Sequence, residues 1–188
     1  ALLNGRGGSV TLRAGDITLR NGAQVDARSA TGSTGAAGSI DIAATGSLLI
    51  SGRSPTDAAF SGLYAETQGS GAGGGIVLAA DTMTLDRGIV RTSTTGAGNA
   101  GPLTVRAGDL AVVNGGWIDA GTSSSGAGGR VDIAASRSIR VSGVDATAVV
   151  ADTIAPDLVR GAAGRAQGPF PSTISSNSAG SGNGGNLS

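Results

Sequence analysis

GPLTVRAGDLAVVNGGWIDA, residues 101–120, contains one complete copy of the repeat that decides the fold. Three apolar-x-apolar triplets follow one another in it: Leu103-Thr104-Val105, Leu110-Ala111-Val112 and Ile118-Asp119-Ala120. An apolar residue at every second position is typical of a β-strand with one buried face. The connections between the triplets are too short for a crossover helix, which needs a dozen or so residues. The stretch therefore predicts three short strands joined by tight corners.

The same three triplets return along the whole chain. The first begins at residues 10, 40, 76, 103 and 131, and Leu187 begins a sixth copy. The second triplet begins seven or eight residues later in every copy, and the third precedes the next copy by 13 residues in four cases and by 15 in the first. A basic period of 27 to 28 residues is typical of a solenoid, in which each turn buries its apolar residues against its neighbours. We expect an all-β parallel β-helix of roughly triangular section, with about five turns and the start of a sixth.

Two copies carry insertions, and both insertions leave the coil between the second and the third strand. The step there is 15 residues in the second copy and 35 in the fifth, against seven or eight elsewhere. The predicted insertion loops are residues 52–60 and 143–171, three turns or about 14 Å apart along the axis. Insertions on one face of a solenoid often form its binding face. A recognition surface, a solvated excursion and a flap that shields an edge all remain open for them.

The longer loop supplies the candidate recognition residues. These are its charged and aromatic side chains: Asp145, Asp152, Asp157, Arg160, Arg165 and Phe170.

Composition agrees with a narrow core. The chain has 35 glycines and only 2% aromatic residues, so stacked aliphatic side chains must fill the interior. The glycine-rich runs at 71–74, 126–129 and 182–185 each stand just before a first strand, and we interpret them as one stacked corner of the coil.

The middle residue of each triplet is expected to point outward. In the third strands these residues include Tyr64, Arg91 and Asp119. We expect Tyr64 to be exposed, and Arg91 and Asp119, in adjacent turns, to form a surface ion pair contributing less than about 1 kcal/mol. Trp117 stands at the entry to a third strand, where we expect it to pack against the corner rather than to stack on a ligand.

Several function classes are excluded or disfavoured by residue content. The chain has no histidine and no cysteine, which excludes Ser-His-Asp triads and the usual zinc sites. Thirteen basic residues balance 13 acidic ones without a basic stripe, so no nucleic-acid partner is expected. The glycine runs lack the aspartates of calcium-binding coils, and no apolar run has the length of a membrane span. We expect no catalytic residue, no cofactor and no metal.

The stretches 5–33 (GRGGSVTLRAGDITLRNGAQVDARSATGS), 98–126 (GNAGPLTVRAGDLAVVNGGWIDAGTSSSG) and 180–188 (GSGNGGNLS) resemble a known repeat. They are similar to the filamentous-haemagglutinin-type β-helical repeats of bacterial two-partner-secretion exoproteins. The resemblance covers the chain except the long insertion after Gly143. It implies a right-handed parallel β-helix, export through a dedicated outer-membrane barrel as partner, and a secreted or cell-surface protein of adhesin type.

The leading hypothesis is a non-catalytic structural stalk that displays an adhesin. Because the chain begins and ends inside a repeat, we expect residues 1–188 to be one β-helix segment of a longer protein. A first alternative is a carbohydrate-binding or carbohydrate-cleaving β-helix with a glycan or host-cell receptor. It would bring Asp57, Asp145, Asp152 or Asp157 together with Arg160 or Arg165 in a cleft. A second alternative is a fibre segment that self-associates by end-to-end stacking of its open β-edges.

Overall fold

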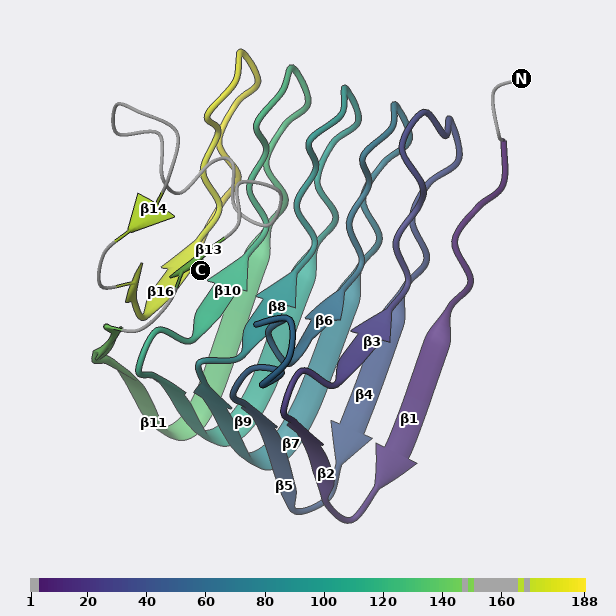
Figure 1. The fold of residues 1–188 in the computed structure, drawn as a ribbon. Helices are drawn as coiled ribbons and strands as arrows, with labels where there is room; N and C mark the ends of the chain where they lie inside the picture. Colours follow the sequence, from purple (N-terminus) through teal and green to yellow (C-terminus); the bar gives the residue numbers. More distant parts are fainter. Residues whose placement is uncertain (1–3, 147–148, 151–165, 168–169) are drawn as a thin grey trace.

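The computed structural model describes residues 4–146, 149–150, 166–167 and 170–188. These residues form an all-β solenoid of about five turns, and none of them lies in a helix. The turns stand side by side from the N-terminal to the C-terminal end of the molecule (Figure 1). The fold class expected from the triplets, an all-β parallel solenoid, is therefore confirmed.

The first and second triplets of all turns lie in one seven-stranded parallel sheet. Turns 1 and 2 contribute β1 (Val10–Ala14), β2 (Ile17–Arg20), β4 (Ile40–Ala44) and β5 (Ser47–Ser51). Turns 3, 4 and 5 contribute one long strand each, β7 (Ile76–Asp86), β9 (Leu103–Val113) and β11 (Val131–Ser142). The expectation of three separate strands is wrong for these turns, because each of them runs as one strand through the bend between the two triplets.

The third triplets form a second, five-stranded parallel sheet. Its strands are β3 (Gln24–Asp26), β6 (Gly62–Tyr64), β8 (Ile89–Arg91), β10 (Trp117–Asp119) and β16 (Thr173–Ser175). Each begins one residue earlier than its triplet, and the triplets pair in the expected register. Two short antiparallel pairs lie outside the coil: β12 (Val144–Asp145) with β15 (Phe170–Pro171), and β13 (Val149–Val150) with β14 (Ala166–Gln167).

Stacked aliphatic columns fill the space between the sheets. Ile42, Leu78 and Val105 are in register in successive turns and fully buried. A fully buried aliphatic side chain contributes about 1.5–3 kcal/mol, so a thin core of this kind suffices for a coil. The next residue of the column, Ile133, is only partly buried, because only the short stretch around Leu187 pairs with β11 beyond it.

The glycine-rich runs form the return limb of a narrow fin that rises from each turn (Figure 1). Backbone hydrogen bonds join this limb to the residues that follow the third strand of the same turn. For example, Gly74 N–H donates to Ala65 O at 2.8 Å, and Gly101 N–H donates to Thr92 O at 3.1 Å. Glycine is required by close packing between turns: a Cβ on Gly74 would lie 1.8 Å from the carbonyl oxygen of Gly38. The runs stack in register, as expected, but they form a limb of a projecting fin and not a corner of the coil. The close approach between turns explains their composition.

A ladder of hydroxyl residues, buried except for Ser178, runs along the outgoing limb of the fins. Ser29, Thr67, Thr94, Thr122 and Ser178 pair in series through single bridges. The hydroxyls of Ser29 and Thr67 are 2.6 Å apart, and Thr94 Oγ1 donates to Thr67 O at 3.3 Å. The fins are therefore ordered by polar stacking rather than by an apolar core.

A left-handed residue marks the corner after the second strand in every turn. The φ angles are 55° at Asn21, 75° at Gly52, 57° at Arg87, 52° at Asn114 and 82° at Gly143. Only glycine, and less readily asparagine, adopts this conformation without cost. The two insertions begin at the two turns in which glycine occupies this corner.

Candidate functional site: the face under the two arms

Two insertions project from the same corner, and the structure anchors them in the same way. We call residues 52–60 arm 1 and residues 143–171 arm 2. After arm 1, Ser61 Oγ donates to Ser51 O at 2.7 Å and accepts from Gly22 N–H at 3.0 Å. After arm 2, Ser172 Oγ donates to Ser142 O at 2.7 Å and accepts from Gly115 N–H at 3.0 Å. Each arm is thus closed by a serine that also bonds to the preceding turn.

The arms meet through an ion pair between Arg53 and Asp145. Arg53 opens arm 1, where it pairs with Phe60, and Asp145 opens arm 2, where it pairs with Phe170. The side chains are 15% and 3% exposed, so the contact is largely removed from water. The Arg53 guanidinium also lies over the Phe60 ring, 4.9 Å from its centre.

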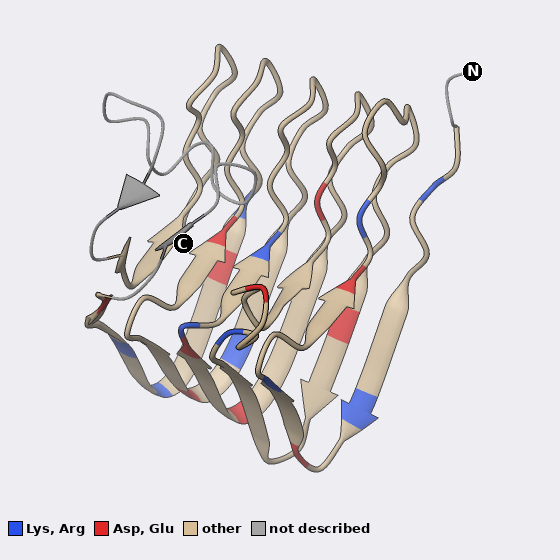
Figure 2. Ribbon diagram, viewed as in Figure 1, with Lys and Arg blue, Asp and Glu red and all other residues tan. Residues whose placement is uncertain are grey.

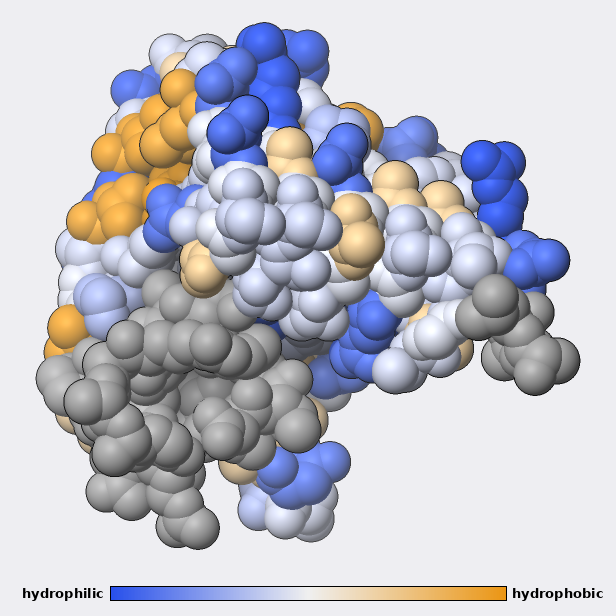
Figure 3. Space-filling view, turned by 90° about the horizontal axis from the view of Figure 1, so that it is seen from above, coloured by the Kyte–Doolittle hydropathy of each residue, from blue (hydrophilic) through white to orange (hydrophobic). Residues whose placement is uncertain are grey.

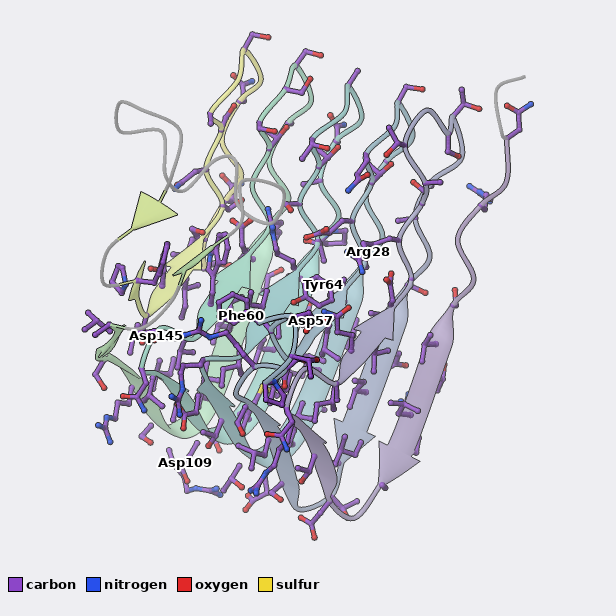
Figure 4. All side chains as sticks on the ribbon, viewed as in Figure 1. Arg28, Asp57, Phe60, Tyr64, Asp109 and Asp145 are labelled. Carbon is purple, nitrogen blue, oxygen red and sulfur yellow. The ribbon has the colours of Figure 1, made fainter. Side chains whose placement is uncertain are left out.

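A second apolar cluster lies beneath the arms, on the outer side of the five-stranded sheet. Its buried members are Phe60, Tyr64, Ile89 and Trp117, and Phe170 packs against them. Figure 4 shows Phe60 and Tyr64 on this face of the molecule. The expectation that Tyr64 is exposed is wrong: it is 3% exposed, because Phe60 and its arm fold back over β6. Trp117 is buried at the entry to β10, as expected.

A buried charge cluster continues the same layer. Arg91 Nε lies 3.0 Å from Glu66 Oε1 and 3.5 Å from Asp119 Oδ2. The pairing of Arg91 with Asp119 was expected, but we expected it at the surface, and both residues are buried, at 3% and 6% exposed. Burial raises the pKa of Glu66, and the positive charges of Arg91 and Arg28 offset part of that rise.

Aromatic rings and carboxylates share these arginines. The Arg91 guanidinium lies 4.9 Å from the centre of the Trp117 ring, and Arg28 lies 5.0 Å from that of Tyr64. Burial raises the pKa of the Tyr64 phenol. Cation–π contacts of this length strengthen when water is excluded, so the layer combines apolar packing with charge.

A small hollow of about 30 Å³ opens where the layer thins toward turn 5. Trp117, Asp119, Thr122, Ser175 and Asn177 line it together with Gly121 and Ala179. Ser175 occupies the position that Arg91 and Asp119 hold in the preceding turns, and its small side chain leaves the space. A hollow of this size holds about one water molecule rather than a sugar ring.

The structure places some of the candidate recognition residues and not others. Asp145 is buried against Arg53, and Phe170 packs on the apolar cluster. Asp152, Asp157, Arg160 and Arg165 lie outside the described residues. Asp57, from the alternative carbohydrate site, is exposed at the tip of arm 1, where hydrogen bonds from Ser54 and Ala59 lower its pKa. Asp57 and Asp145 therefore bond to different partners, as their separate places in Figure 4 suggest.

Sequence reasoning missed Arg53, Phe60 and Glu66. The two insertions do share a signal that identifies their ends: Ser51-Gly52 and Ser142-Gly143 open them, and Ser61 and Ser172 close them. A phenylalanine stands one or two residues before each closing serine. This parallel could have placed Phe60 beside Phe170.

The remaining surface is mixed. Charged residues are scattered along both sheets and the corners (Figure 2). Apolar side chains gather at the end formed by turn 5 (Figure 3), where Ile139 and Val141 are 52% and 44% exposed although they continue buried columns. In the described part of the chain, no three acidic side chains are grouped as a metal site would require. Nor does the described part contain a helix with the length and hydrophobicity of a membrane span.

Comparison with known proteins found no match to this chain among family models, curated proteins or solved structures.

Proposed function

We propose that this chain is a rigid, non-catalytic display segment of a secreted bacterial surface protein of the filamentous-haemagglutinin type. The observation that carries the proposal is the use of arginines to join turns. Arg13 binds Asp41 in the next turn, and Arg91 contacts acids in the turns before and after it. Arg137 binds Asp109 one turn back and Asp81 two turns back. Such contacts resist bending and separation of the turns, which is what a stalk requires.

The face under the arms supports the same role. Its conspicuous side chains, Trp117, Tyr64 and Arg91, are buried in contacts between turns rather than presented to solvent. The repeat style of residues 5–33 and 98–126 supports the bacterial, two-partner-secretion part of the proposal.

Rigidity is tested by a distance measurement along the axis. Thr18 and Arg140 are exposed and belong to one column of the large sheet, four turns apart. Because the chain has no cysteine, Thr18→Cys and Arg140→Cys accept two spin labels selectively. Pulsed electron resonance should give a single narrow distribution, with backbones about 19 Å apart. A broad or bimodal distribution would refute a rigid stalk.

Display at a cell surface is tested separately. An antibody against the chain should label intact cells of the source organism, and added protease should remove the signal without lysis. Signal that appears only after permeabilisation would refute surface display while leaving the rigidity result untouched.

A further inference from the structure

The two arms bridge turns that are not neighbours. Arm 1 leaves turn 2 and arm 2 leaves turn 5, so turns 3 and 4, with β8 and β10, lie between their bases. Adjacent strands of a sheet are about 4.8 Å apart, which puts the bases about 14 Å apart. The Arg53–Asp145 ion pair spans this interval.

The junction is built to resist separation. Asp145 is 3% exposed, and Gly115 makes room for it: a Cβ on Gly115 would lie 2.6 Å from the Asp145 Cβ. Pulling Arg53 away would break an ion pair that is largely removed from water, which is unfavourable. Phe60 holds the other side of the guanidinium.

Two continuous layers run under the junction, and each takes one residue or more from turns 2, 3, 4 and 5. The apolar layer contains Tyr64, Ile89, Trp117 and Phe170 in that order of turns. The polar layer runs from Glu66 through Arg91 to Asp119, whose Oδ1 accepts from Ser175 Oγ at 2.9 Å. Contacts therefore connect each turn to the next and also connect turn 2 directly to turn 5.

We propose that the two arms form a strap that makes residues 53–145, from the end of turn 2 into turn 5, one mechanical unit. Ordinary solenoid repeats interact only with their nearest neighbours and are released one at a time. A direct link between the second and fifth turns removes that option, because no turn inside the strap can leave before the link opens. The inference deepens the display role and rests on it, since a stalk is loaded along its axis.

Pulling single molecules through their two termini with optical tweezers tests the strap. One turn, such as the 27 residues from Ile76 to Leu103, releases about 95 Å of extended chain. In the natural chain, the residues before Arg53 and after Asp145 can peel first, and the residues enclosed by the ion pair should then open in one event of about 320 Å. Asp145→Ala should replace that event by successive steps of about one turn each. Arg106→Ala, which removes an exposed arginine of β9, serves as the matched control and should keep the single event.

A second version of the experiment guards against a variant that fails to fold. Arg53→Cys with Asp145→Cys can be joined by a short bis-maleimide linker, because the chain has no other cysteine. The link forms only when the two positions lie side by side, so it shows that the variant folds, and it shields residues 54–144 from the pulling force. The unlinked protein should release these residues in steps of about one turn each. An unlinked protein that opens them in one event would overturn the strap. A natural chain that is stiff in the spin-label measurement but releases its turns singly would also overturn the strap, and the display role would stand. A natural chain that is flexible in the spin-label measurement would refute the display role itself.

Discussion

Two adjacent glycines at the base of a fin should respond to alanine in opposite directions. A Cβ on Gly74 would lie 1.8 Å from Gly38 O and 2.7 Å from Gly38 C, whereas a Cβ on Gly75 would meet only Pro102, at 3.5 Å or more. Real Cβ contacts are not shorter than 3.0 Å, so Gly74→Ala must move two backbones apart by about 1.2 Å. No side-chain rotation can relieve this clash, because the atoms in contact belong to the main chain.

The magnitude follows from the bonds that such a displacement breaks. Gly74 N–H donates to Ala65 O at 2.8 Å, and Ala37 N–H donates to Ala72 O at 2.9 Å across the same fins. Each backbone hydrogen bond contributes about 0.5–1.5 kcal/mol net, so the loss of these two bonds in Gly74→Ala should lower the free energy of unfolding by about 1–3 kcal/mol. Gly75→Ala should raise it by about 0.4–1 kcal/mol, because alanine reduces the freedom of the unfolded chain and fits the folded one.

Urea denaturation followed by far-ultraviolet circular dichroism and by the fluorescence of Trp117 provides the assay. The two variants differ by one position and have the same composition, so they share every effect of alanine except the contact with Gly38. Equal changes in both variants, or a Gly74→Ala protein as stable as the natural one, would refute the account of the glycine columns as close packing between turns.

Two further predictions concern the left-handed corner residue of turn 3 and the loss of stability at low pH. Arg87→Asn should stabilise the chain by up to about 1 kcal/mol, because asparagine adopts the φ of 57° at this position more easily than arginine does, and because the ion pair that is lost with Asp86 is exposed. Thermal denaturation of Arg87→Asn beside the control Arg106→Asn checks this prediction. A melting temperature that falls only in Arg87→Asn would contradict it. Hydrogen bonds from Arg130 and Ser188 lower the pKa of Asp132 from 3.8 to about 2. Because the folded pKa lies below the unfolded one, this stabilisation is present above about pH 4 and is lost as the pH falls toward 2. Urea midpoints across that range should fall less steeply in Asp132→Asn, and parallel curves would contradict the assignment.

The repeating part of the fold was predictable from the sequence because every turn repeats the same constraint. One residue in two must be apolar to fill a narrow prism, and a shift of one residue would expose a whole column. Leu48, Met83 and Leu110 therefore mark the inward side without ambiguity, and they are buried in register. The bend between first and second strand left no such mark, so the fusion of the two into β7, β9 and β11 was not foreseen.

The outer layer was not predictable by the same means. Tyr64 occupies an outward position, and the period-two pattern assigns it to solvent. It is buried because Phe60 returns over it, and Phe60 belongs to an insertion that occurs in no other turn at that length. Glu66 follows its strand in a fin, outside any triplet, and only the stacking of turns 2 and 3 brings it to Arg91. Burial by a non-repeating segment leaves no periodic signal in the residues that it covers.

The stacking of turns favours arginine wherever one side chain must contact two other turns, in a chain whose basic residues are all arginine. Arg137 lies at the register shift of β11, and its guanidinium crosses turn 4 above Gly108. A Cβ on Gly108 would lie 2.3 Å from the guanidinium carbon Cζ of Arg137. From there Nε donates to Asp109 and Nη1 to Asp81, both at 2.7 Å, so one side chain binds carboxylates in two other turns. A guanidinium presents donors in a fixed planar fork, whereas an ammonium is a single point of charge. Arg91 also lies between carboxylates of two other turns, with Nε 3.0 Å from Glu66 Oε1 and 3.5 Å from Asp119 Oδ2. In a coil whose turns are about 4.8 Å apart, a flat, many-donor cation reaches two turns at once, and lysine would reach one.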